Sequence, residues 1–148
     1  MGLSFLLNLF FFVSGINRHL SLLLASGVMA SSYYISNHLI NLNYNVWVYI
    51  EWMVYDLVTI FTIYILHRLI NVKSCIAVYY VFLGLSINST LFFMMFFDIH
   101  ILGSTSSSWF WHLYTIIVNS VDVLMVAALI LNRDFLLLKK LKFLYKNE

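Results

Sequence analysis

The stretch VWVYIEWMVYDLVTIFTIYIL, residues 46–66, decides the class of fold. It is about 21 residues of nearly continuous apolar and aromatic sequence, which is the length that a helix needs to cross a bilayer. The same stretch carries two acids, Glu51 and Asp56. A charge at the centre of a membrane costs at least about 2.5–3.5 kcal/mol, so these acids need polar neighbours or a bound proton.

The composition of the whole chain agrees with this stretch. Of 148 residues, 63% are hydrophobic and only 9% are charged, which lies outside the range of soluble globular proteins. A net charge of +2 gives no indication of nucleic-acid binding. The chain lacks proline and is rich in Phe, Tyr, Ile and Asn, which indicates an AT-rich genome and therefore a low-GC bacterium, a mobile element or an organelle. We expect one all-α membrane domain.

The apolar segments predict a bundle of four transmembrane helices, at residues 20–35, 46–66, 75–97 and 109–131. Residues 1–16 are apolar but short, and we interpret them as an interfacial or half-inserted helix, with a thin fifth span as the alternative. Residues 132–148 form a basic tail with the pattern of an amphipathic helix. We expect that helix to lie on an anionic membrane surface through Lys139, Lys140, Lys142 and Lys146.

Basic residues alternate along the chain in the way that four spans require. Arg18, Arg68, Lys73 and the tail lysines would share one side, while the connectors 36–45 and 98–108 contain neither Lys nor Arg. The positive-inside rule then places the C-terminus on the cytoplasmic or matrix side of an inner membrane, most plausibly a bacterial one. Aromatic residues that fall at the opposite interface agree with this: Tyr33, Tyr34, Tyr44, Trp47, Trp109 and Trp111.

Polar side chains recur at helical spacing within three of these spans. In the central span the stripe is Glu51, Tyr55, Thr59 and Thr62, with Asp56 beside it. In the last span it is His112, Thr115, Asn119 and Asp122, and in the third it is Tyr79, Ser86 and Ser89/Thr90, with Asn88 close by. Such faces are expected to point into the bundle, away from lipid.

The two acids Asp56 and Asp122 fall near the midplane of helices that run in the same direction, so they could meet. No Lys or Arg lies at that depth in the sequence. We expect at least one of the two acids to hold a proton at neutral pH, because like-charge repulsion and loss of water both favour the neutral form.

This polar seam has three interpretations: it holds helices or subunits together, it conducts protons or cations, or it pairs with a basic residue of a partner. The candidate residues are Glu51, Asp56, Asp122, Asn119, His112, Thr59 and Asn88. A separate group of small residues in the first full span is expected to permit close helix packing: Ala25, Ser26, Gly27, Ala30 and Ser31.

The histidines and the single cysteine give weaker signals. His38, His100 and His112, with Asp98, suffice in number for a zinc or copper site, but their spacing matches no compact ligand motif. His19 and His67 are interpreted as solvated interfacial residues, and Cys75 as a buried, inert thiol. No hydrolase, metalloprotease or phosphate-loop motif occurs. We therefore expect no metal, no cofactor and no enzymatic activity.

These observations favour a non-enzymatic subunit of a membrane assembly, whose partners are the lipid bilayer and other membrane proteins or further copies of itself. The alternative is a homo-oligomeric channel or transporter for protons or cations that uses the midplane acids. A toxin-immunity or holin-like protein is a less favoured interpretation.

Overall fold

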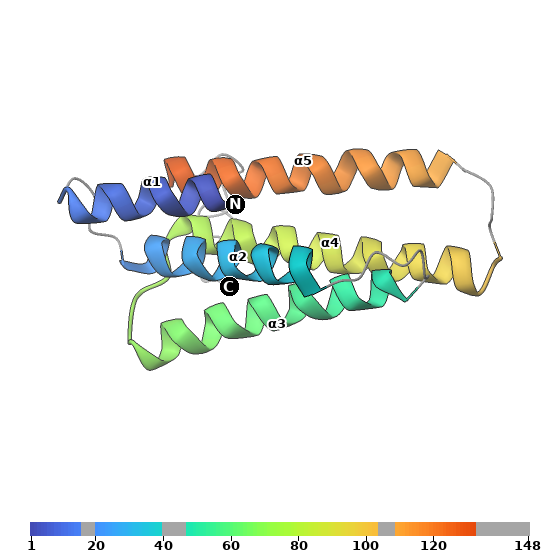
Figure 1. The fold of residues 1–148 in the computed structure, drawn as a ribbon, viewed down its shortest axis with the longest axis horizontal. Coiled ribbons are helices and arrows are strands. Elements are labelled where there is room, and N and C mark those ends of the chain that lie inside the picture. The colour runs from blue at the N-terminus through green and yellow to red at the C-terminus, as the bar shows by residue number, and fades with distance from the viewer. Residues whose placement is uncertain (16–19, 40–46, 104–108, 133–148) are drawn as a thin grey trace, which may run out of the picture.

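The computed structural model describes residues 1–15, 20–39, 47–103 and 109–132, and within these ranges α-helix is the regular secondary structure. The helices are α1 (Gly2–Val13), α2 (Leu20–Leu39), α3 (Val48–Leu69), α4 (Ile76–His100) and α5 (Trp109–Leu131) (Figure 1). Helix α2 continues beyond residue 35 and α4 beyond residue 97, so each is longer at its C-terminal end than the sequence predicted. The tail with its four lysines, and also His19 and Tyr44, lie outside the described residues.

Three of these helices, α3, α4 and α5, are long and apolar enough to cross a membrane. The apolar parts of α1 and α2, Gly2–Val13 and Leu20–Ser36, are shorter. The expectation of an all-α integral membrane protein is therefore confirmed in this coarse form. The number of spans stays a prediction.

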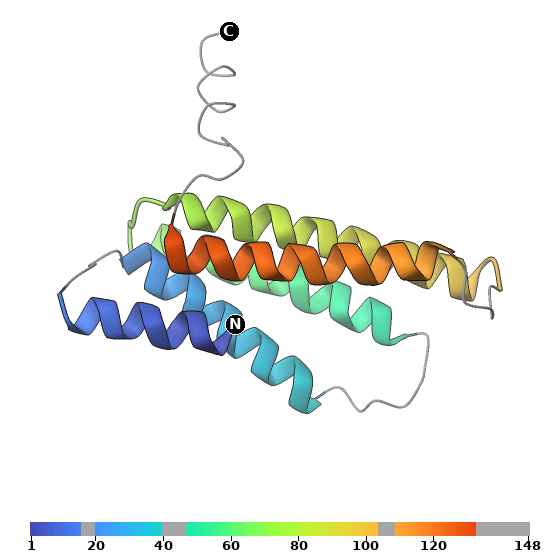
Figure 2. The ribbon, with the colours of Figure 1, turned by 90° about the horizontal axis from the view of Figure 1, so that it is seen from above.

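Helix α4 is the centre of the bundle. It packs along α3 on one side and α5 on the other, and α2 also contacts it (Figures 1 and 2). Its buried face includes Tyr80, Gly84, Leu85 and Asn88. Gly84 lets α5 approach closely, because a Cβ at this position would lie 2.5 Å from the sulfur of Met125.

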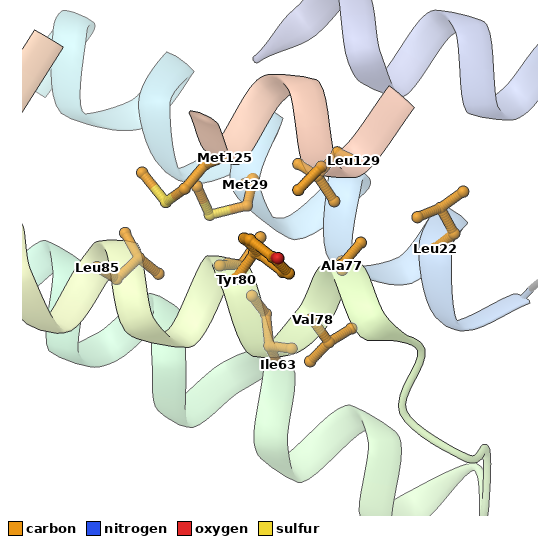
Figure 3. Packing of buried hydrophobic residues seen from close by; sticks show 12 residues of the cluster. Leu22, Met29, Ile63, Ala77, Val78, Tyr80, Leu85, Met125 and Leu129 are labelled. Atoms are coloured by element: carbon orange, nitrogen blue, oxygen red, sulfur yellow. The ribbon is translucent and has the colours of Figure 1, made fainter. Parts of the chain in front are cut away.

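The core forms where α2, α3, α4 and α5 meet. Figure 3 shows Tyr80 of α4 at its centre, between Met29 of α2 and Ile63 of α3. Met125 and Leu129 of α5 complete this side of the core, and each of these side chains is almost fully buried. Close packing of these large side chains gives the dispersion attraction that holds helices together where lipid offers no hydrophobic driving force.

The small residues of α2 differ in their surroundings. Ala25 and Ser26 are fully buried, while Gly27 and Ala30 are half-buried and Ser31 is exposed. A Cβ at Gly27 would lie 3.2 Å from the ring of Phe5, so this glycine is the point at which α1 approaches α2.

Helix α1 begins partway along α5 and runs toward the end of the bundle at which α5 finishes (Figures 1 and 2). It turns its polar face inward, since Ser4 and Asn8 are its buried residues. The Asn8 side-chain amide donates a hydrogen bond of 3.0 Å to the carbonyl oxygen of Leu129. The apolar side chains Leu3, Leu6 and Phe10 are exposed on the outside, as in a helix that faces lipid.

At the same end of the bundle, a hydrogen-bonded group joins α2, α3 and α4. His67 is buried, its Nδ1 donates to the carbonyl oxygen of Ile63 at 2.8 Å, and its Nε2 lies 2.8 Å from the hydroxyl oxygen of Ser21. In a neutral ring with that tautomer, Nε2 accepts the Ser21 hydroxyl proton. The Ser21 oxygen also accepts the backbone N–H of Cys75 at 3.0 Å. The interpretation of His67 as a solvated residue is therefore wrong, because Ser21 gives the ring a partner within the bundle.

Candidate functional site

A partly open cavity of about 320 Å³ lies among four helices, on the side of the core away from His67. Helix α2 contributes Ser32, Tyr33 and Ser36 to it, and α3 contributes Trp52, Tyr55 and Asp56. The remaining lining residues come from α4 and α5: Asn88, Phe92, Tyr114, Thr115, Val118, Asn119 and Asp122. Two acids and several other polar groups therefore line one cavity inside the bundle.

Asp122 is held in this cavity by two donors from different helices. The Tyr33 hydroxyl donates to Asp122 Oδ1 at 2.8 Å, and the Asn88 amide nitrogen donates to the same oxygen at 2.9 Å. A carboxyl group that accepts from α2 and from α4 is fixed in position on α5. These bonds supply the polar surroundings that an acid inside a membrane requires.

Asp56 and Asn88 each have a hydrogen-bond acceptor atom that no described donor satisfies. Among the residues that the structure describes, Asp56 Oδ2 and Asn88 Oδ1 are both buried and have no hydrogen-bond partner. Asn88 is only 2% exposed, and its amide nitrogen is already used by Asp122. Buried acceptors of this kind are rare and expensive, which indicates that a donor or a cation belongs in the cavity.

The aromatic side of the cavity is a cluster of four rings from three helices. The Trp52 and Phe92 ring centroids lie 5.5 Å apart, and those of Phe92 and Tyr114 lie 6.1 Å apart. Tyr49 closes the group, at 5.6 Å from Trp52 and 6.2 Å from Tyr114. The tyrosine pair is a ring contact between α3 and α5, so the cluster covers the cavity at the end where these two helices begin.

The sequence-predicted residues separate into two groups. Asp56, Asp122, Asn88 and Asn119 line the cavity together. Asn119 is exposed, and its amide donates to the carbonyl oxygen of Thr115 at 2.8 Å, so it belongs to the margin of the cavity.

The other three candidates, Glu51, His112 and Thr59, do not line the cavity. Glu51 and His112 are both exposed. Thr59 is buried, donates to the carbonyl oxygen of Tyr55 at 2.7 Å and lies 2.5 Å from the hydroxyl oxygen of Ser32. Because its own proton is used in α3, Thr59 accepts from Ser32 and thereby ties α2 to α3.

The cavity residues that the sequence pattern did not predict include aromatic side chains as well as Ser32 and Ser36 of α2. Tyr33 is not an interfacial anchor, because its hydroxyl contacts Asp122 inside the bundle. Trp52 and Tyr114 also line the cavity, although no stripe included them. One signal was available: Trp52 lies four residues before Asp56, so the two share a helix face.

The described residues that line the cavity include acids but no basic side chain. None of its lining residues is Lys, Arg or His, so the described walls carry carboxyl groups, amides, hydroxyls and rings but no basic side chain. Within the described ranges, no three His, Cys, Asp or Glu residues come close enough to hold a metal ion together. The arrangement is suited to a proton or to a positively charged or hydrogen-donating guest.

The fold and the cavity together describe an all-α protein with apolar helices long enough to cross a membrane and with two acids lining one cavity among its helices. Searches against protein families, curated proteins and solved structures find no match to this chain.

Proposed function

We propose that this protein is a polytopic inner-membrane transporter or channel that moves protons or cations, with Asp56 and Asp122 as its acidic site. The observation that carries the proposal is that these two acids, on α3 and α5, line one cavity with no basic side chain among the residues described around it. Ionisable groups inside membranes are expensive and are typically found on ion or proton pathways. No enzymatic activity forms part of the proposal.

In this proposal α2 serves as a fourth span beside α3, α4 and α5. Its 20 residues correspond to a helix of about 30 Å, close to the thickness of the hydrocarbon core. Arg68 and Lys73 then face the cytoplasm or matrix, together with the C-terminus. A single bundle of this size is small for a complete pathway, so the working unit is a homo-oligomer.

The test is flux in liposomes that contain the purified protein. A proton or Na⁺ gradient is imposed, and the interior is followed with a dye sensitive to that ion. We expect flux with the wild type and loss of most of it with Asp56→Asn and with Asp122→Asn, which keep the side-chain size but remove the charge. Glu51→Gln is the matched control, because Glu51 is an exposed acid on the same helix as Asp56 and lies outside the cavity. Equal flux with all four proteins contradicts the proposal.

A second candidate function is a subunit of a membrane assembly. The partly open cavity and the unpartnered Asp56 oxygen favour it, since a basic side chain from a partner could enter and pair with this acid. Extraction in mild detergent tests it: co-purification of other membrane proteins in fixed ratio supports a subunit. A chain that stays monomeric in detergent and in bilayers rules out both an assembly and a homo-oligomer.

A further inference from the structure

The cavity is large for a bare ion. A water molecule occupies about 30 Å³ in the liquid, so a volume of about 320 Å³ corresponds to several waters and lies at the small end of the range of ligand pockets. A proton or Na⁺ would leave most of this space to be filled by water. A compact organic molecule would fill it.

The side chains that line the cavity indicate which charge such a molecule should carry. The unpartnered polar atoms, Asp56 Oδ2 and Asn88 Oδ1, are both acceptors, and the described walls contain no cation to neutralise the acids. A guest that donates hydrogen bonds and carries a positive charge satisfies both requirements at once. A neutral or anionic guest would leave an acid unpaired in a medium of low dielectric.

The aromatic rings of the cavity indicate what the uncharged part of such a molecule should be. Trp52, Phe92 and Tyr114 line the cavity as a continuous aromatic surface. Aromatic faces attract cations and also cover apolar groups, and tryptophan is the strongest of the three in cation binding.

The two carboxyl groups do not have the same role. Asp122 already accepts hydrogen bonds from Tyr33 of α2 and from Asn88 of α4, both on Oδ1, so these helices hold its carboxyl group in position. Asp56 keeps a buried oxygen that no described residue satisfies. Asp56 is therefore the acid whose acceptor oxygen still needs a donor, and Asp122 holds the neighbouring groups in place.

We propose that the cavity binds a monovalent organic ammonium ion, with the ammonium group at Asp56 and Asn88 and an apolar or aromatic substituent against Trp52, Phe92 and Tyr114. This inference rests on the proposed cation transport and names the class of substrate.

The experiment measures binding of 2-phenylethylammonium to the purified full chain in lipid nanodiscs, with empty nanodiscs subtracted. We expect saturable binding to the wild type and at least about tenfold weaker binding to Asp56→Asn, because the guest loses its charge partner. Trp52→Leu should weaken binding by about threefold to thirtyfold. Two controls should bind as the wild type does: Glu51→Gln, and Trp109→Leu, which changes an exposed tryptophan outside the cavity.

A second variant of Asp56 and a neutral analogue of the ligand serve as further comparisons. Asp56→Glu retains the carboxyl group and should keep binding within a few-fold, which separates loss of charge from loss of folding. The neutral analogue 2-phenylethanol should bind at least about tenfold more weakly than the ammonium ion. Equal binding of the two compounds, or equal binding by wild type and Asp56→Asn, overturns the inference.

Failure of this inference differs from failure of the proposed function. If the ammonium ion does not bind but flux of protons or Na⁺ still depends on Asp56, the substrate class is wrong and cation transport stands. If neither binding nor flux depends on Asp56, both proposals are overturned.

Discussion

The hydroxyl of Tyr33 donates a hydrogen bond of 2.8 Å to Asp122 Oδ1, across 89 positions of sequence. This bond joins α2 to α5, which otherwise pack together less extensively than α5 packs with α4. With the Asn88 amide on the same oxygen, it makes Asp122 the polar junction of three helices. One carboxyl group therefore links three of the four helices that form the cavity walls.

Removal of the Tyr33 hydroxyl should destabilise the bundle. Tyr33→Phe keeps the ring but takes one of two donors from Asp122, and we expect a loss of about 0.5–2 kcal/mol in the free energy of unfolding. Unfolding in mixed micelles with increasing sodium dodecyl sulfate measures this loss. Tyr64→Phe is the control, because Tyr64 is an exposed tyrosine of α3, and it should change stability much less. Equal effects of the two substitutions would show that the bond contributes nothing specific.

Addition of a methyl group at Gly84 should separate α4 from α5. The new Cβ would lie 2.5 Å from Met125 Sδ and 3.1 Å from Val121 Cγ1, and Met125 is fully buried, so the clash falls inside the packed interface of α4 and α5. We expect Gly84→Ala to cost about 1–3 kcal/mol in unfolding free energy. Gly2→Ala, where a Cβ meets nothing within 4 Å, is the matched control. Partial rescue by a second change, Met125→Val, would identify the clash as the cause.

Loss of the Ser21 hydroxyl should loosen the end of the bundle near Cys75. Ser21→Ala leaves the Cys75 backbone N–H and the His67 ring without this partner, at a cost of about 1–3 kcal/mol. Cys75 is the only cysteine, and it is half-buried rather than buried as the sequence predicted, so its rate of reaction with a maleimide reports opening of this region. We expect faster labelling in Ser21→Ala than in the wild type. Ser86→Ala, which removes an exposed hydroxyl bonded within its own helix, should leave the rate unchanged.

The number of spans can be tested by labelling from one side of the membrane. Cysteines are placed one at a time at Ser14 and Gly103 in a Cys75→Ala background, and an impermeant maleimide is added to intact cells. Four spans predict that Gly103→Cys reacts from outside and that Ser14→Cys reacts only after the membrane is opened. If α2 does not cross, Ser14→Cys reacts from outside as well, and the four-span arrangement is wrong.

The acids of the site could be predicted because acids are so rare in apolar spans. Asp56 and Asp122 stand out in the sequence, and both lie, with Asn119, among the residues that line one cavity. Glu51 was predicted with them, but residues five positions apart on a helix project in directions about 140° apart, so both acids could not face inward. Hydrophobicity is nearly uniform around α3, and the pattern alone therefore did not show which acid faces the cavity.

The aromatic wall and the tyrosine partner could not be predicted in the same way. An aromatic residue near the end of a span suits the interface as well as the interior. Only the contact between α2 and α5 distinguishes Tyr33 from its neighbour Tyr34, which is exposed. The Ser21–His67 pair could not be predicted for the same reason. Its members are 46 positions apart in the sequence, and neither belongs to a recognisable motif.

The central position of α4 has a consequence for motion. Helices α3 and α5 each pack along α4, and among the described helices they have no comparable contact with each other. A rotation of either helix about α4 would change the separation of Asp56 and Asp122. The energy between two charges varies inversely with their separation, so the occupancy of the acids and the angle between these helices are thermodynamically linked. Neutralisation of one acid would lower the electrostatic cost of bringing α3 and α5 closer together, and a closer approach of these helices would favour neutralisation by the same free energy.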